Sequence, residues 1–119
     1  MEQLEVSREL GATGSTSILR LKGPLTLATV HILQQAFREI GNVDTVVDVS
    51  KVPYIDSGGL GTILAQWSQT QKTFRKFALT GTHARIDLLL DITKVNTVMP
   101  IFRTAEEADR SFIGKAATA

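Results

Sequence analysis

Apolar and polar residues alternate at the beginning of the chain, and two stretches share this pattern. Leu4 and Val6 alternate with polar neighbours, and Ile18, Leu19 and Leu21 resume the apolar pattern further on. Glycine and serine interrupt the pattern at positions 11, 14 and 15. Alternation of this kind with a glycine-rich break predicts two strands joined as a hairpin.

The next three segments are predicted as a helix, a strand and a second helix from the spacing of their apolar residues. Apolar residues three or four positions apart predict an amphipathic helix closed by Gly41, with the buried face Leu27, Val30, Leu33, Phe37 and Ile40. The valine-rich run 43–49 predicts a strand buried on both faces of a sheet. A second helix is predicted to begin near Ser57 and to end at 71–73, with the apolar residues Leu60, Ile63, Leu64 and Trp67. Its Trp67 fits the core and a partly exposed anchor equally well.

The last third of the chain repeats the alternation of strand and helix. Residues Phe74, Phe77, Ala78 and Leu79 predict a strand, and Ile86, Leu89 and Leu90 a short helix. A brief strand over 98–102 is interrupted by Pro100, which favours an edge position. Thr104 and Glu107 have the spacing of a capping box at the start of a last helix. The order of elements predicts an α/β fold with a mostly parallel, mixed sheet, an N-terminal hairpin and about four helices.

Composition narrows the class of protein. A chain of 119 residues is the size of one domain, so we expect a single domain over 1–119 with a frayed tail at about 115–119. The formal net charge of +1 gives no reason to expect direct nucleic-acid binding, and Lys72, Arg75 and Lys76 are interpreted as a solvated helix end. No apolar run approaches the roughly 20 residues that span a bilayer, and the acidic start is unlike a signal peptide, which predicts a cytoplasmic protein without a membrane segment.

The unusual chemistry of the chain is concentrated in residues 53–61, Pro-Tyr-Ile-Asp-Ser-Gly-Gly-Leu-Gly. A glycine-bearing loop that opens a helix leaves backbone N–H groups at the positive end of the helix dipole, where a phosphate or carboxylate can bind. A nucleotide- or anion-binding sensor is therefore one hypothesis for this loop. The simplest role for Ser57 is an N-cap, and for Asp56 a loop or capping acid rather than a metal ligand.

An enzyme is not predicted. The string Asp-Ser-Gly-Gly also surrounds the nucleophile of chymotrypsin-like serine proteases, but those enzymes need about twice this length and a histidine and an aspartate placed to activate the serine. The two histidines, His31 and His83, are expected in structural or surface roles. The chain has no cysteine, no Walker-type lysine after the glycines and no spacing typical of metal ligands. We therefore expect no catalytic residue, no cofactor and no metal site.

Residues 46–61 resemble the signature of the STAS domain, which occurs in bacterial anti-sigma factor antagonists and in the cytoplasmic part of sulfate transporters. Supporting similarity covers nearly the whole chain. Residues 23–27 resemble the turn before the family's first helix, 82–90 its third helix and 101–108 its closing segment.

This resemblance implies a regulator that binds an anti-sigma factor, a serine kinase with a histidine-kinase-like ATP fold, and thereby frees a sigma factor. Phosphorylation is the family's usual switch, and the acceptor is the second hydroxyl residue of Asp-Ser-Ser-Gly-Leu or Asp-Ser-Thr-Gly-Leu. Here that position is Gly58, and Thr26 matches the family's turn aspartate. We therefore expect that the usual switch is missing and that Ser57 is the one remaining phosphorylation candidate. The predicted partner-binding residues are Thr26, Tyr54, Asp56, Ser57, Gly58 and Gly59.

Overall fold

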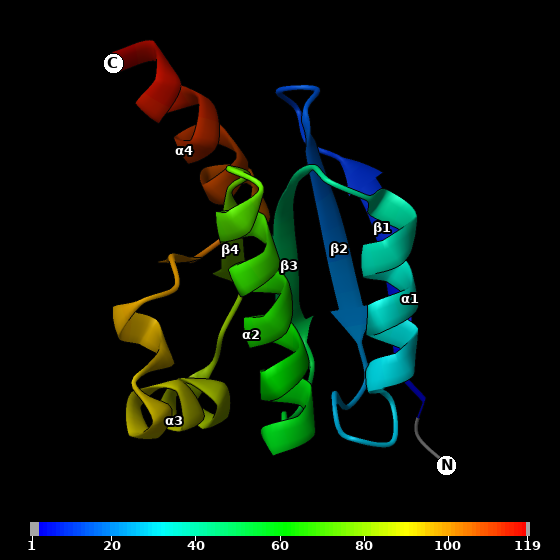
Figure 1. Ribbon diagram of the computed structural model, residues 1–119. Helices are drawn as coiled ribbons and strands as arrows, with labels where there is room; N and C mark the ends of the chain where they lie inside the picture. The colour runs from blue at the N-terminus through cyan, green and yellow to red at the C-terminus, as the bar shows by residue number, and fades with distance from the viewer. Residues whose placement is uncertain (1–2, 119) are drawn as a thin grey trace.

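The computed structural model describes residues 3–118, which form five strands and four α-helices (Figure 1). The elements follow in the order β1 (Glu5–Leu10), β2 (Thr16–Lys22), α1 (Val30–Ile40), β3 (Asp44–Lys51), α2 (Ser57–Lys72), β4 (Phe77–Thr80), α3 (Ala84–Thr93), the 3₁₀ turn η1 (Val95–Thr97), β5 (Ile101–Phe102) and α4 (Ala105–Thr118). The predicted α/β fold with an N-terminal hairpin and four helices is confirmed.

The strands form one sheet in the order β1-β2-β3-β4-β5. β1 pairs with β2 in antiparallel fashion, and the other three pairings are parallel. The helices α1, α2 and α3 pack on one face of the sheet through the larger apolar core, whereas α4 packs on the other face. The parallel strands all end at the same edge, so the loops that follow β2 and β3 are brought together there (Figure 1).

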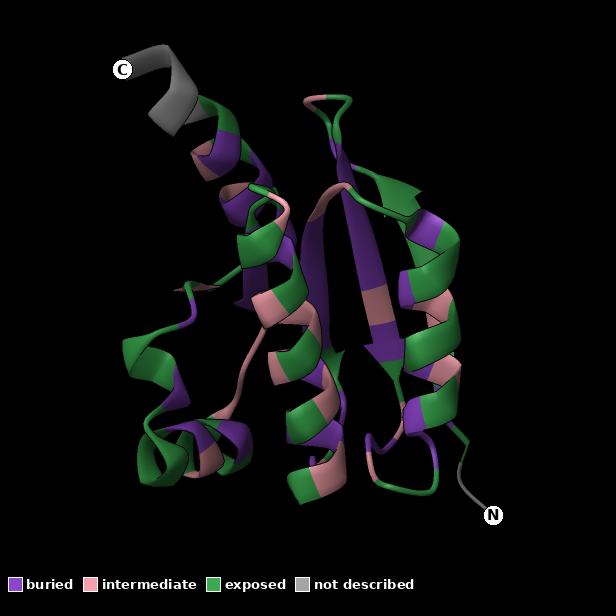
Figure 2. Cartoon of the chain, in the orientation of Figure 1, coloured by how far each residue is buried: buried purple, intermediate pink, exposed green. Residues whose placement is uncertain are grey.

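β3 lies in the middle of the sheet and is buried on both faces (Figure 2). Val47 and Val49 belong to the core under α1 and α2, and Val46 to the core under α4. This confirms the burial predicted from the valine run. On the α1 face the rings of Phe37 and Phe77 meet edge to face with their centroids 6.5 Å apart.

α4 is tied to the β1–β2 hairpin by a buried carboxylate. The Thr13 hydroxyl donates to Asp109 Oδ1 at 2.6 Å, and the Thr13 backbone N–H donates to Oδ2 at 3.2 Å. Burial raises the pKa of Asp109, but the neighbouring hydroxyl and backbone N–H groups, those of Thr13 foremost, together outweigh burial, so the pKa lies below its usual value. The ionised side chain therefore stabilises the folded chain.

Two short predicted segments were wrong. Phe74 does not begin a strand: it is 94% exposed and lies in the turn that ends α2, so β4 begins at Phe77. Val98 is exposed after the 3₁₀ turn, and β5 contains only Ile101 and Phe102. In both places an apolar residue was assigned to a strand although local turn geometry keeps it outside the sheet.

The C-terminal end of the chain is helical to Thr118, and Ala119 lies outside the described residues. A frayed tail at 115–119 stays a prediction. Among residues 3–118, no helix is both long and apolar enough to cross a bilayer.

Candidate functional site

The predicted site lies where β3 leaves the sheet and α2 begins, in the strand–loop–helix order expected from the sequence. After Lys51 the chain makes a tight turn in which the Val52 N–H donates to the Val49 carbonyl at 3.0 Å. The loop then runs in extended form to Asp56, and α2 starts at Ser57. The site is thus built on the end of the most buried strand.

A second segment, the turn at residues 23–27 after β2, is hydrogen-bonded along this loop. The Leu25 N–H donates to the Tyr54 carbonyl and the Asp56 N–H donates to the Leu25 carbonyl, both at 3.2 Å. These bonds form an isolated parallel bridge between Leu25 and Ile55, whose side chains are buried. The two segments therefore form one rigid surface at the C-terminal edge of the sheet.

Asp56 connects both segments and caps α2. Its Oδ1 accepts the Gly59 N–H at 2.9 Å, as an N-cap does, and its Oδ2 accepts the Leu27 N–H of the neighbouring turn at 3.1 Å. These two hydrogen bonds, the first from Gly59 and the second from Leu27, hold the pKa of Asp56 below its usual value. The prediction that Ser57 is the N-cap was wrong, because Ser57 is the first helical residue and is exposed. The expectation that Asp56 is a capping acid is confirmed.

The two glycines at the start of α2 permit this close approach. A Cβ atom at Gly59 would lie 2.3 Å from the Leu25 carbonyl oxygen. A Cβ at Gly58 would lie 3.0 Å from both Cα and Cβ of Leu27, which is tighter than most real contacts. Leu27 therefore occupies the space into which a side chain at position 58 would point.

Leu27 itself differs from its predicted role. It was placed on the buried face of the first helix, but α1 begins at Val30 and Leu27 is 75% exposed. The cause is a tight turn: the Thr26 carbonyl accepts the N–H groups of Thr29 and Val30, each at 2.9 Å, and the Thr26 N–H donates to the Thr29 hydroxyl. The turn holds Leu27 outward, next to Gly58.

Two residues of the site were not predicted, because they come from α3 and its N-cap. The guanidinium carbon of Arg85 lies 5.1 Å from the centroid of the Tyr54 ring, within the range of a cation–π contact. The Nε2–H group of His83 donates a hydrogen bond to the Val52 carbonyl oxygen at 2.7 Å. Both contacts join α3 to the loop, and they give His83 a structural role of the kind expected from the sequence.

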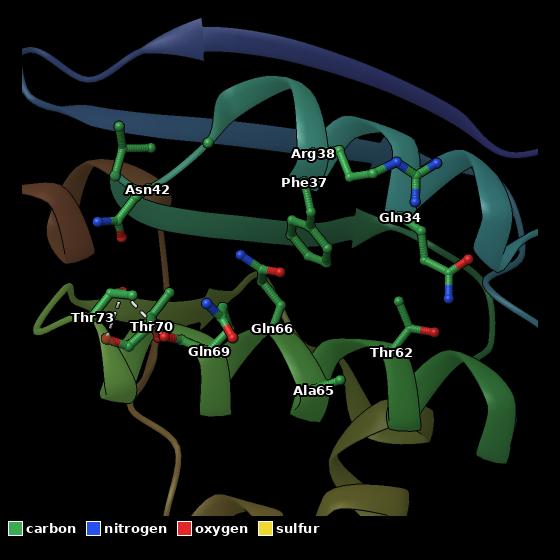
Figure 3. A pocket seen from close by; sticks show the side chains of 12 residues that line it. Gln34, Phe37, Arg38, Asn42, Thr62, Ala65, Gln66, Gln69, Thr70 and Thr73 are labelled. Carbon is green, nitrogen blue, oxygen red and sulfur yellow. Dashed lines mark hydrogen bonds between the residues drawn. The ribbon is translucent and has the colours of Figure 1, made fainter.

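A separate hollow lies away from this loop. It has a volume of about 530 Å³ and lies between α1 and α2, with the Phe37 ring at its floor and the amides of Gln34, Gln66 and Gln69 around it (Figure 3). None of the six predicted partner-binding residues lines it. This hollow is therefore separate from the predicted site, which carries the exposed side chain of Leu27.

Within the described residues, no group of three or more histidine, aspartate or glutamate side chains is placed to hold a metal ion. Ser57 Oγ has no hydrogen bond to a histidine among residues 3–118, and Nε2 of His83 is engaged with the backbone. The arrangement holds a loop rigidly, and the described residues assemble no activated nucleophile around Ser57.

Comparison with known proteins identifies the family and similar folds. The STAS domain family matches residues 7–108. The fold is similar to a putative anti-sigma factor antagonist from Thermotoga maritima, with 21% identity over 90% of this chain and 93% of the other and a TM-score of 0.80. It is also similar to an anti-sigma factor antagonist from Mycobacterium paratuberculosis, with 18% identity over 92% and 94% and a TM-score of 0.83. A Bacillus cell fate determinant in its phosphorylated form matches with 17% identity over 90% and 99% and a TM-score of 0.66.

Proposed function

Because the chain belongs to the STAS domain family, we propose that it is a non-enzymatic anti-sigma factor antagonist that binds its partner through residues 53–61, the adjoining turn and the start of α2. The partner is an anti-sigma factor of the serine-kinase class. Such a regulator acts in the cytoplasm, where sigma factors work. The observation that carries the proposal is the surface around Asp56. Its carboxylate accepts the N–H groups of Leu27 and Gly59, and Tyr54 lies on the loop just before the helix start.

The rigidity of this surface supports a docking role. Asp56 bonds both segments, and backbone bonds join Leu25 to Tyr54 and to Asp56. A partner that binds here finds the loop already ordered, so less conformational entropy is lost on association. The exposed Leu27 and the half-buried Tyr54 supply the apolar and aromatic contacts that often dominate binding energy.

The same geometry supports the absence of the family's usual phosphorylation switch. Gly58 carries no hydroxyl, and Leu27 fills the space beside it. Ser57 is one residue away, which on a helix turns the side-chain direction by about 100°. A phosphate on Ser57 would also lie next to the ionised Asp56, whose carboxylate already accepts the N–H of Gly59. We infer that partner binding here does not depend on phosphate at the helix start.

The alternative of a nucleotide or anion bound at this helix end has less support. The Gly59 N–H donates to Asp56 Oδ1 and the Leu60 N–H donates to the Asp56 carbonyl. The chain's own carboxylate thus occupies the position where an external anion would bind. A second anionic group there would be repelled.

The test uses a purified serine-kinase anti-sigma factor from the same genome, Mg²⁺ and ATP. We expect a complex in analytical ultracentrifugation and an unchanged intact mass of this chain after incubation. Leu27→Asp and Tyr54→Ala should each weaken the complex about tenfold or more, since they remove contacts at the centre of the surface. His31→Ala, on the exposed side of α1, is the matched control and should bind like the unaltered chain.

Two results would overturn the proposal, and a third would remove one part of it. The first is no complex with the kinase. The second is a complex that Leu27→Asp and Tyr54→Ala leave unchanged. The third, stoichiometric phosphorylation of Ser57 with release of the kinase, would restore the switch and remove only that part of the proposal.

A further inference from the structure

The C-terminal end of α2 holds a bulky side chain, Phe74, in a strained backbone conformation. Its last turn is a Schellman motif, in which the Arg75 N–H donates to the Thr70 carbonyl at 2.8 Å and the Phe74 N–H donates to the Gln71 carbonyl at 3.4 Å. Phe74 occupies the left-handed position of this motif with φ of 59°. Glycine is the usual residue there, because a side chain at this conformation causes strain.

The Phe74 side chain does not compensate for that strain by burial. It is 94% exposed, more than the other large apolar side chains of residues 3–113. The backbone conformation and the exposed ring are thus both unfavourable for the isolated fold. A bulky residue that is held in this way is better explained by a contact with something outside the chain.

A hollow lies beside Phe74, at the junction of α2, β4 and α4. Its volume is about 360 Å³, and its lining is mostly aromatic and apolar: Phe74, Phe77, Pro100, Phe102 and Phe112. The hollow is bordered by Arg75 and Lys76 and by the polar Gln71 and Ser111. It therefore combines an apolar floor with a basic rim.

The charges around this hollow are unbalanced. Lys72, Arg75 and Lys76 are exposed, and none of them forms an ion pair with an acidic residue among residues 3–118. Asp44 contacts the backbone of this segment: its Oδ1 accepts the Lys76 backbone N–H at 2.9 Å. The two charged residues that line the hollow, Arg75 and Lys76, are both cations, and this positive rim complements an acidic ligand.

We propose that the C-terminal end of α2, its Schellman turn and the facing part of α4 form a second docking surface, which binds an acidic peptide segment that carries an apolar side chain. The apolar side chain enters the hollow against Phe74 and Phe102, and its acidic neighbours pair with Arg75 and Lys76. A small aromatic-lined hollow has room for one apolar side chain. A nucleic acid, in contrast, binds along an extended basic groove.

This surface is independent of the loop at 53–61. The two lie at opposite ends of α2, with the loop at the lower end in Figure 1 and the Schellman turn at the upper end beside α4. A helix of 16 residues is about 24 Å long. The two surfaces can therefore bind two different segments at the same time.

The test is a selection of random twelve-residue peptides on the folded chain, followed by fluorescence anisotropy of the enriched peptides. We expect a consensus with one leucine or aromatic residue flanked by aspartate or glutamate. Phe74→Gly should weaken the binding of these peptides about tenfold or more while it raises Tm by about 4 °C, because glycine relieves the strained conformation. A gain in stability together with a loss of binding distinguishes a docking residue from a structural one.

Charge and specificity are tested with further variants. Arg75→Glu should weaken the peptide about tenfold without lowering Tm. His31→Ala is again the control and should leave the binding unchanged. The proposal is overturned by a selection that returns no acidic consensus, by enriched peptides that bind Phe74→Gly as well as the unaltered chain, or by a single-stranded oligonucleotide that binds as tightly and depends equally on Phe74.

Discussion

Gly59 and Gly61 lie two residues apart in α2, and the structure predicts that the same substitution has opposite effects at these positions. In Gly59→Ala the new methyl group would lie 2.3 Å from the Leu25 carbonyl oxygen and 2.9 Å from Leu25 Cγ. In Gly61→Ala the new methyl group meets no atom within 4 Å. The pair therefore separates the cost of the close contact from the general preference of helices for alanine.

The magnitudes follow from these contacts. Alanine is favoured over glycine in a helix by about 1 kcal/mol, so Gly61→Ala should raise Tm by about 4 °C. At position 59 the gain is opposed by a backbone clash that costs about 3 kcal/mol and by the weakening of the Asp56–Leu25 hydrogen bond, about 1 kcal/mol more. Gly59→Ala should therefore lose about 3 kcal/mol net, which lowers Tm by about 12 °C.

The assay is thermal and urea unfolding followed by circular dichroism at 222 nm, with both variants in one buffer. A difference of about 4 kcal/mol between the two variants supports the close approach of the turn at 23–27 to the start of α2. If Gly59→Ala were as stable as Gly61→Ala, the contact between Leu25 and the helix would be refuted, and with it the shape of the docking surface.

Two further predictions concern the carboxylates. Asp56→Ala should destabilise the chain by about 1–2 kcal/mol, because the N-cap and the hydrogen bond to Leu27 are both lost. Ser57→Ala should change the unfolding free energy by less than about 0.5 kcal/mol. An equal loss of stability in both variants would contradict the assignment of Asp56 as the cap. The pKa of Asp109 is lower in the folded chain than in the unfolded chain, where it is about 3.9. The ionised side chain therefore contributes its full stabilisation above the unfolded pKa, and this stabilisation is lost as the pH falls through the lower folded pKa. Acid titration of the unfolding free energy should show this loss in the unaltered chain and not in Asp109→Asn, and identical profiles below pH 4 would contradict it.

Most of the fold could be predicted because its elements carry strong, separate patterns. The valine run identified β3, and the spacing of Leu33, Phe37 and Ile40 identified α1. These residues are buried for the reason that the pattern implies, since one face of a helix or both faces of a central strand must lie against the core.

The errors occurred where a local turn overrides the apolar pattern. Leu27 has the spacing of the α1 face, but the turn from Thr26 to Thr29 places it outside the helix. Phe74 is next to a real strand, but the Schellman motif leaves it exposed. Apolar residues are usually inside, and a single sequence does not reveal the positions where hydrogen bonds hold one outside.

The candidate site was predicted in its location but not in its construction. The sequence placed Tyr54, Asp56 and the two glycines between β3 and the start of α2, and the structure places them there, whereas their role in binding stays a prediction. The Leu27 and Arg85 contacts to this loop come from segments about 30 residues away on either side, and their pairing depends on the sheet topology. Long-range pairing of this kind is not encoded in local periodicity.

The central claim is that this loop docks a serine-kinase anti-sigma factor without a phosphorylation switch. The most direct test measures the kinase complex and the intact mass of the chain together, before and after Mg²⁺ and ATP are added, for the unaltered chain and for Gly58→Ser. The account predicts that the unaltered chain keeps its mass and stays bound throughout. A phosphoryl group on Ser57 of the unaltered chain, gained as the complex dissociates, would contradict it.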